Sequence, residues 1–369
     1  MSFPSFYVAS TGQHVGKTTT CLGLLSGLNK KTKSVGFLKP IGQQYVEISK
    51  KTLVDKDVLP FKDRFCTRLK EEVMSPVVIP QGFTKSFIDG EISEKSLRKK
   101  IIGAYKFINK YYHTTVVEGT GHVGVGSVIN LSNAQVASML GLDIILIASG
   151  GLGSSFDAIA LNKALCDAHG IKIKGVILNK VIEDKKEMII SYMTRALKSL
   201  DIPIIGSVPH VQALSNPTMK DFEILFDTSL LSGEKYIMRQ FYHTRLVATS
   251  LKNYQHNYVH NQLIITPANR EDIILSTLTK YWDWKASDLS SDFCTGLILT
   301  GTTPPKHTIV EALKKACIPT IYVSLSNYKV MEMITSYTVK IRREDDQKIN
   351  EAISVVEENI DFEKLFKSF

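Results

Sequence analysis

The 369-residue sequence has few cysteines, and they follow no metal-binding or disulfide pattern. Cys166 and His169 form a C-x-x-H pair with no second pair nearby, as a zinc site would need. Disulfide frameworks are typical of short secreted chains with regularly spaced cysteines. We therefore expect neither kind of site and interpret the cysteines as small buried hydrophobic residues. No CxxC pair occurs among them; they are Cys21, Cys66, Cys166, Cys294 and Cys317.

Long apolar runs are also missing. No run reaches the roughly 18 residues that a membrane span needs, and no apolar stretch follows a basic N-terminal segment as in a secretory leader. The hydrophobic content of 44% and charged content of 22% are those of a soluble globular protein. We expect a cytoplasmic protein that does not contact membranes. Its length predicts two domains, because domains usually have about 100–200 residues.

The net charge of +9 raises the question of a nucleic-acid partner. The lysines and arginines occur in short, separate clusters without interleaved aromatic residues, and no nucleic-acid-binding module is recognisable. We interpret these clusters as solvated faces and expect no nucleic acid among the partners.

Apolar runs and helical patterns alternate over residues 1–212. Most of the runs are continuous stretches of valine, isoleucine and leucine, which is typical of strands buried on both faces of a parallel sheet. The alternation predicts a doubly wound, mostly parallel α/β domain. Its six expected strands lie within residues 5–9, 34–42, 113–119, 143–149, 174–181 and 202–209.

The pattern changes character between Pro209 and Pro217. Three further apolar runs, at residues 261–267, 293–301 and 317–325, alternate with helical patterns. We expect a second, smaller α/β domain at residues 213–335, followed by a charged helical tail at residues 336–369.

A loop rich in glycine and threonine, STGQHVGKTTTC, connects the first expected strand to a leucine-rich helix. Backbone N–H groups of such a loop converge on a phosphate at the helix N-terminus, where Lys17 can reach the outer phosphates and the Thr18 hydroxyl can bind Mg²⁺. The gap between Gly12 and Gly16 is one residue shorter than in the general pattern, so a turn that only resembles a phosphate cradle is the alternative. The flanking strand and helix favour nucleotide binding.

The expected strand at residues 113–119 ends on Glu118, a candidate second ligand for the magnesium ion. The glycines that follow, Gly119, Gly121 and Gly124, also spell the G-x-G-x-x-G pattern of dinucleotide sites, with Asp143 as its acidic partner. That acid belongs at the end of the next strand, whereas Asp143 begins it. We therefore favour the magnesium interpretation, with a solvated loop carboxylate as the alternative for Glu118.

Several motifs together resemble a known family. In order, ASTGQHVGKTTT, VGFLKPIGQ, VDKDVL, VVEGTGH, GVILNKV and IIGSVP resemble dethiobiotin synthetases, and more closely the dethiobiotin-synthetase-like P-loop region at the N-terminus of long phosphotransacetylases. The stretch from LSNPTMKDF to the segment ending IPTIYV is similar to the DRTGG domain that accompanies that region. The resemblance covers roughly residues 3–335 and implies a P-loop NTPase fold with ATP and Mg²⁺ as cofactors.

The resemblance also implies roles for individual residues. Lys17 and Lys39 would act near the transferred phosphate, with Thr18, Asp57 and Glu118 holding Mg²⁺. Asn179 would read the adenine edge, and Pro209 would flank the base. Alternatively, Lys39 is solvated, Asp57 caps a helix and Asn179 caps a turn. The phosphate cradle would comprise Gly12, Gln13, His14, Val15, Gly16, Lys17, Thr18 and Thr19.

The departures concentrate in the half that would bind a substrate. Gln43 and Gln44 follow Gly42 where dethiobiotin synthetases have a serine that holds the carbamate, and Ser10 stands where the family usually has the first glycine of the loop. In the second domain, residues 269–270 read Asn-Arg in place of Asp-Arg, and residues 300–302 read Thr-Gly-Thr in place of Thr-Gly-Gly. The nucleotide-binding half is therefore better preserved than the substrate half.

These observations favour a regulatory or sensor protein that binds ATP and hydrolyses it slowly. The alternative is an ATP-dependent carbon–nitrogen ligase of the dethiobiotin synthetase or cobyrinic acid a,c-diamide synthase type. We expect no acetyltransferase activity, because an acyltransferase domain needs well over about 100 residues after the second domain. Besides the nucleotide, the expected partners are either a small carboxylate or amine substrate or a regulated protein, and the family resemblance implies a homo-oligomer.

Overall fold

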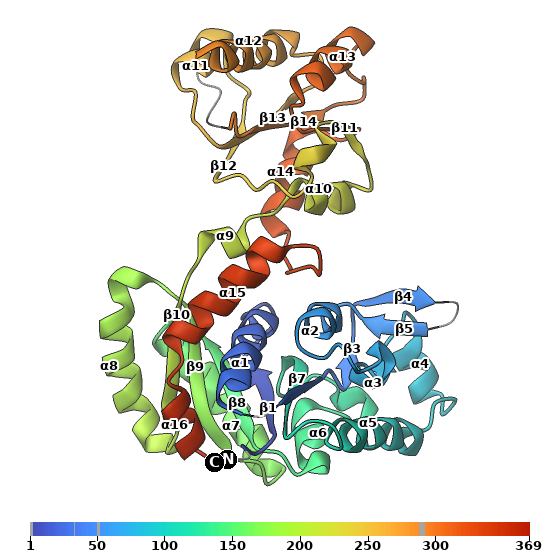
Figure 1. Cartoon of the computed structure of the whole chain (residues 1–369), viewed down its shortest axis with the longest axis vertical. Helices are drawn as coiled ribbons and strands as arrows, with labels where there is room; N and C mark the ends of the chain where they lie inside the picture. The colour runs from blue at the N-terminus through green and yellow to red at the C-terminus, as the bar shows by residue number, and fades with distance from the viewer. Residues whose placement is uncertain (1–2, 33, 50–51, 288–291) are drawn as a thin grey trace. The chain divides into compact units, whose positions relative to one another are not determined.

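The computed structural model describes residues 3–32, 34–49, 52–287 and 292–369. The chain divides into two compact units, which are described separately (Figure 1). The first comprises Met1–Val211 together with Ile341–Phe369, and the second comprises Gln212–Lys340. Among the helices of the described ranges, none combines the length and the apolar character that crossing a membrane requires.

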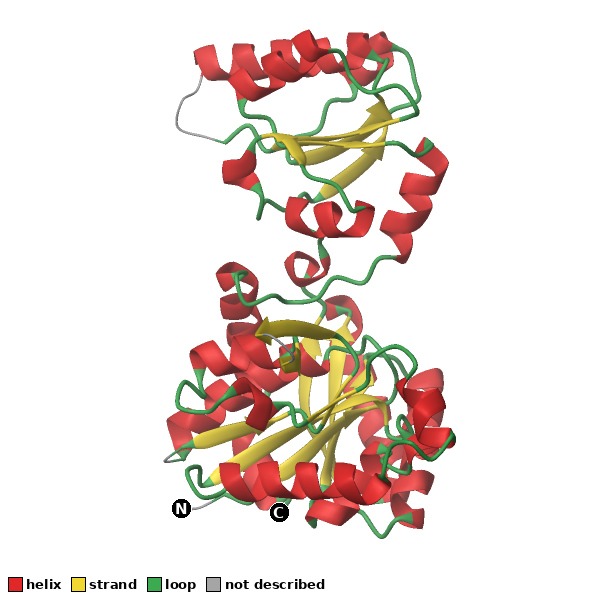
Figure 2. Cartoon of the chain, turned by 90° about the vertical axis from the view of Figure 1, so that its right-hand side faces the viewer, coloured by secondary structure: helices red, strands yellow, loops and turns green. Residues whose placement is uncertain are grey.

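The first unit is built around a six-stranded parallel sheet with the order β10-β9-β8-β1-β7-β2. Helices lie on both faces of this sheet, so its central strands are buried on both sides, as their continuous apolar runs require (Figure 2). The predicted doubly wound parallel sheet is confirmed. Its strands are β1 (Phe6–Ser10), β2 (Val35–Leu38), β7 (Thr114–His122), β8 (Ile144–Ser149), β9 (Ile173–Val181) and β10 (Ile204–Pro209).

Two small sheets, β3-β6 and β4-β5, lie between β2 and β7 in the sequence. Their strands are β3 (Ile41–Gly42), β4 (Tyr45–Ser49), β5 (Thr52–Asp55) and β6 (Val77–Val78). The α-helices of the first unit are α1 (Lys17–Lys31), α2 (Val58–Arg64), α3 (Glu71–Met74), α4 (Phe83–Ile88), α5 (Glu94–Ile108), α6 (Asn133–Leu140), α7 (Gly153–Ala168), α8 (Lys186–Leu197), α15 (Asp346–Asn359) and α16 (Phe362–Lys367).

We expected a charged helical tail at residues 336–369, and the structure places residues Ile341–Phe369 in the first unit. Helix α15 packs along α1 and against β10, and the segment between α15 and α16 pairs with β10 through Gly206 and Ile360. Two glycines of α1 make this close packing possible. A Cβ atom at Gly23 would lie 2.3 Å from a side-chain atom of Val356, and one at Gly27 would lie 2.1 Å from the ring of Phe362.

The second unit has a five-stranded sheet with the order β11-β15-β14-β13-β12, in which only β11 is antiparallel to its neighbour among the strand pairs of the described residues. Alternate residues of its strands enter two cores. Ile264 and Leu297 face α11, α12 and α13, whereas Leu263 and Ile298 face α10 and α14. The smaller α/β domain predicted here is confirmed.

The second unit contains all the remaining α-helices and strands that the structure describes. Its strands are β11 (Leu230–Ser232), β12 (His243–Leu246), β13 (Gln262–Pro267), β14 (Thr295–Thr300) and β15 (Thr320–Val323). Its α-helices are α9 (Gln212–Ser215), α10 (Met219–Phe226), α11 (Leu251–His256), α12 (Glu271–Ser287), α13 (His307–Ala316) and α14 (Asn327–Ser336).

Candidate nucleotide site

The loop from β1 to α1 has the backbone geometry of a phosphate cradle. Gly16, the N-cap of α1, has φ of +98°, in the left-handed region that favours glycine. A Cβ atom at this position would lie 2.2 Å from Nδ2 of Asn179, so any side chain here would also collide with the neighbouring strand. Because glycine has no side chain to cap the helix, the first-turn N–H groups are left to bind an anion.

Lys17 reaches back across this loop. Its Nζ atom lies 2.8 Å from Oγ of Ser10 and 3.0 Å from the carbonyl oxygen of Gly121, to both of which it donates hydrogen bonds. Ser10 stands where dethiobiotin synthetases usually have the first glycine of the loop, and its hydroxyl helps to hold the lysine. From the sequence we noted Ser10 only as a departure from the family's loop pattern and predicted no function for it.

Behind the loop, Lys39 lies between two carboxylates. Its Nζ atom is 3.0 Å from Oδ2 of Asp57 and 2.7 Å from Oε1 of Glu118, and all three side chains are nearly inaccessible to solvent. Burial alone lowers the pKa of Lys39, but the charges of Glu118 and Asp57 outweigh it, so the pKa is raised well above its ordinary value. The solvated alternative for Lys39 is therefore wrong.

Sheet register brings Glu118 to the loop. In the pairing of β1 with β7, Glu118 lies opposite Val8, two residues before the end of β1, so its side chain reaches the first turn of α1. Oγ1 of Thr18 donates a hydrogen bond to Oε1 of Glu118 over 3.0 Å. The carboxylate is completely buried and is thus not a solvated loop carboxylate.

The second Glu118 oxygen, Oε2, is buried and has no hydrogen-bond partner within the described residues. A buried, unsatisfied carboxylate oxygen is costly unless a ligand completes it. Mg²⁺ in nucleotide sites is typically held by one or two carboxylates together with phosphate oxygens and water. The hydroxyl of Thr18 and the carboxylates of Asp57 and Glu118 fit that requirement, although no group of three His, Cys, Asp or Glu side chains with metal-site geometry occurs in the described ranges.

Asp57 stands at the N-cap position of α2, but its side chain makes no capping hydrogen bond to that helix. Its carboxylate instead pairs with Lys39. Asp55, which we did not single out from the sequence, holds the backbone of Asp57 in place. Oδ1 of Asp55 accepts the Asp57 N–H at 2.9 Å, and Oδ2 accepts the N–H groups of Gln43 and Gln44. Burial and the charge of Asp57 raise the pKa of Asp55 to about 6.

Asn179 and Pro209 lie near the carboxyl ends of the neighbouring strands β9 and β10. Nδ2 of Asn179 donates a hydrogen bond to the carbonyl oxygen of Val15 over 2.7 Å, which fixes the cradle against β9. Lys180 makes a second such contact, with its Nζ atom 2.9 Å from the carbonyl oxygen of His14. Pro209 is half-buried at the end of β10. The base-binding roles of both residues stay predictions.

The comparisons with known families agree with this geometry. Residues 5–218 match the family described as AAA domain (AAA_26). The chain belongs to this AAA-domain family. Residues 225–337 match the DRTGG domain, so the second unit of the AAA-domain protein carries the fold that we expected from its motifs.

Curated relatives confirm the predicted resemblance to the N-terminal region of phosphotransacetylases. A phosphate acetyltransferase of Nitratidesulfovibrio vulgaris is 24% identical over 380 aligned residues, which cover 98% of this chain and 51% of that protein. The AAA-domain protein thus spans about half the length of such relatives. The ATP-dependent dethiobiotin synthetase BioD of Nitrosopumilus maritimus is 24% identical and covers 58% of this chain and 92% of its own. Among solved structures, the MinC:MinD cell division protein complex of Aquifex aeolicus matches 57% of this chain and 83% of its own, with 15% identity and a TM-score of 0.37.

We predict that ATP binding by the AAA domain, measured in EDTA, weakens above pH 8. Burial lowers the pKa of Lys17 to about 8, against the opposing effect of Glu118. The ammonium that attracts phosphate is therefore lost from the free protein above this pH, where the ATP phosphates are already fully ionised. Affinity measured by calorimetry should fall about tenfold per pH unit above 8.

Lys17→Arg is the control for this pH dependence, because a guanidinium stays charged throughout the range. An affinity of the wild type that stays constant from pH 7 to about 9.5 would contradict a direct interaction of Lys17 with phosphate.

Proposed function

We propose that the AAA domain binds ATP with Mg²⁺ and that the protein acts as a regulator or sensor, with only slow ATP hydrolysis. The observation that carries this proposal is the meeting of Thr18, Lys39 and Glu118 behind the glycine loop, with one buried Glu118 oxygen left without a partner among the described residues. We further infer that the protein is cytoplasmic, as its composition indicates, and that it forms homo-oligomers, as its family resemblance implies.

Different residues of the chain would bind the phosphates and the Mg²⁺ ion. The N–H groups of Gly12 to Thr19 would bind the phosphates, and Lys17 would exchange Ser10 and Gly121 for a phosphate oxygen. Mg²⁺, held by Thr18, Asp57 and Glu118, would neutralise phosphate charge. Lys39 pairs with both carboxylates, so the oxygen ligands are positioned before the nucleotide arrives.

The chain path supports a regulatory role. The second unit is connected to the AAA domain through the end of β10 and through the segment before α15. Helix α15 packs on α1, the helix that begins at Lys17. A change at the phosphate cradle that displaces α1 would therefore act directly on a segment that is covalently joined to the second unit.

The test is the magnesium dependence of ATP affinity in Glu118→Gln. We expect this variant to bind ATP at least about tenfold more weakly than wild type with Mg²⁺ present and within about twofold of wild type in EDTA, measured by calorimetry. Glu94→Gln is a matched control, because Glu94 lies at the start of α5 in the same unit and pairs with Arg98 near the surface. Equal losses in both conditions would contradict the metal-binding role of Glu118.

Phosphate release by the wild-type protein distinguishes a regulatory protein from an ATP-dependent ligase. Phosphate release from ATP should stay slow when diaminopelargonate and bicarbonate are added, since Gln43 and Gln44 replace the small hydroxyl residue of dethiobiotin synthetases. A rise to about 1–10³ turnovers per second would favour a ligase.

A further inference from the structure

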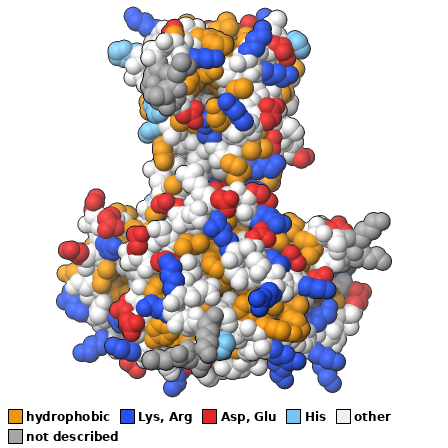
Figure 3. Space-filling view, viewed as in Figure 1, with side chains coloured by type: hydrophobic (Ala, Val, Ile, Leu, Met, Phe, Trp, Pro, Cys, Tyr) orange, Lys and Arg blue, Asp and Glu red, His pale blue; other side chains and the backbone are white. Residues whose placement is uncertain are grey.

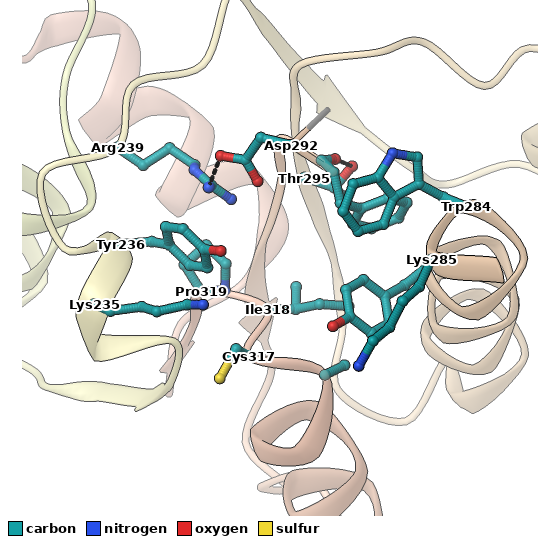
Figure 4. A pocket seen from close by; sticks show the side chains of 13 residues that line it. Lys235, Tyr236, Arg239, Trp284, Lys285, Asp292, Thr295, Cys317, Ile318 and Pro319 are labelled. Carbon is teal, nitrogen blue, oxygen red and sulfur yellow. Dashed lines mark hydrogen bonds and ion pairs between the residues drawn. The ribbon is translucent and has the colours of Figure 1, made fainter. Parts of the chain in front are cut away.

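The second unit contains a pocket of about 250 Å³ that none of the motifs predicted. It lies at the amino ends of β14 and β15, opposite the carboxyl ends at which parallel α/β sheets usually bind ligands. Residues 235–239, residues 281–285 of α12 and the segments leading into the two strands surround it (Figure 4). It shares no residue with the candidate nucleotide site.

One wall of the pocket is aromatic and rigid. The ring of Phe293 is buried in the core beneath α12. The ring centroids of Tyr281 and Trp284 lie 5.3 Å and 5.8 Å from that of Phe293. Rings held in this way offer a preformed apolar surface on which a flat ring can stack, because little side-chain freedom remains to be lost on binding.

Across the pocket, Tyr236 is the centre of a positively charged cluster. The guanidinium of Arg239 lies 3.6 Å and Nζ of Lys235 lies 4.5 Å from the Tyr236 ring centroid. Arg239 also forms an ion pair with Asp292, the pair drawn with a dashed line in Figure 4. Asp292 therefore balances the charge of Arg239 and not that of Lys235.

Lys285 supplies a second unbalanced ammonium from α12, with Nζ 6.0 Å from the Tyr281 ring centroid. Neither Lys235 nor Lys285 has a carboxylate partner within the part of the chain that the structure describes. The pocket thus combines a stacking surface with two lining lysines, Lys235 and Lys285, whose charge no carboxylate of the described residues balances.

We propose that this pocket binds a mononucleotide, with its base against the wall of Tyr281, Trp284 and Phe293 and its phosphate between Lys235 and Lys285. A phosphate has several acceptor oxygens and so can accept hydrogen bonds from both ammonium groups. The pocket's volume of about 250 Å³ lies just below the range of about 300–1,000 Å³ that is usual for drug-sized ligands, so a mononucleotide fits it better than a dinucleotide. The second unit is thereby a nucleotide sensor independent of the ATP site.

The tryptophans provide the assay, because the two in the sequence, Trp282 and Trp284, both lie in α12. In the Trp282→Phe protein, the fluorescence of Trp284 reports on the pocket alone. We expect AMP, added in EDTA, to change this fluorescence saturably at concentrations below about 1 mM. Adenosine and inorganic phosphate, which each lack one half of the ligand, should bind at least about tenfold more weakly.

Two sets of variants locate the site. Lys235→Met combined with Lys285→Met should weaken AMP binding at least about tenfold. Lys329→Met should not, since Lys329 is an exposed lysine of the same unit on α14, which packs against the opposite face of the sheet. Lys17→Ala should leave AMP binding at Trp284 unchanged even if it abolishes ATP binding by the AAA domain, so the two proposals fail separately.

The proposal is overturned if AMP gives no saturable change or if adenosine binds as tightly as AMP. An unaltered affinity in the double lysine variant would also overturn it, and so would loss of the signal in Lys17→Ala, which would place AMP in the AAA domain.

Discussion

Lys39→Met is expected to destabilise the protein by about 3–5 kcal/mol in EDTA, and Mg²⁺ is expected to restore part of this loss. The side chain of Lys39 is only 4% exposed and pairs with both Asp57 and Glu118. Methionine fills a similar volume but leaves two buried carboxylates facing each other without a cation. The free energy of unfolding, from urea denaturation followed by circular dichroism, measures the loss.

A matched control is Lys163→Met, which removes an ammonium that pairs with Asp167 on the surface of α7. Exposed pairs of this kind contribute roughly 0–1 kcal/mol. In Lys39→Met, millimolar Mg²⁺ should stabilise the protein more than it stabilises wild type, because the ion no longer competes with an ammonium for the carboxylates. A loss below about 1 kcal/mol would show that Lys39 does not neutralise this cluster.

Lys17→Ala is expected to abolish the stabilisation that ATP with Mg²⁺ gives to the wild type. At a nucleotide concentration about 100 times its dissociation constant, that stabilisation is about 2.7 kcal/mol. The Nζ atom of Lys17 is a positive charge at the cradle that can turn toward the phosphates from its contacts with Ser10 and Gly121. Thermal unfolding with and without nucleotide gives the measurement.

The fold itself should survive Lys17→Ala, since this lysine is the first residue of α1 and its ammonium lies at the phosphate cradle, not in the hydrophobic core. Lys31→Ala, at the far end of the same helix and paired loosely with Glu363, should keep the full response to nucleotide. A Lys17→Ala protein that ATP stabilises as strongly as wild type would contradict the phosphate-binding role of the loop.

Much of the candidate site could be predicted from the sequence, because the motifs that indicate it are local. The glycine loop lies next to the strand and helix that define it, and Glu118 ends an apolar run whose register in a parallel sheet follows from the fold class. Asp57 was found only through the family resemblance. Asp55 was missed because its role, accepting the backbone N–H groups of residues 43, 44 and 57, depends on how the two small sheets pack against each other through β3, β5 and β6.

The position of α15 was not predictable in the same way. An amphipathic helix indicates that it will pack on something, but its partner lies more than 300 residues away in the sequence. A signal was nevertheless present in α1. Gly23 and Gly27 are four residues apart on one helical face, and in a helix interior glycine costs about 1 kcal/mol relative to alanine. Two such residues on one face indicate that another segment packs closely there, although they do not say which.

This packing sets the order in which the protein can fold during synthesis. Helix α1 leaves the ribosome more than 300 residues before Val356 and Phe362, which cover its glycine face. Domains generally fold as units during translation, from the N-terminus onward. The first unit cannot do so, because its helices α15 and α16 follow the whole second unit in the sequence. The second unit therefore has time to fold first, while the glycine face of α1 stays exposed and open to wrong partners until the C-terminal helices arrive.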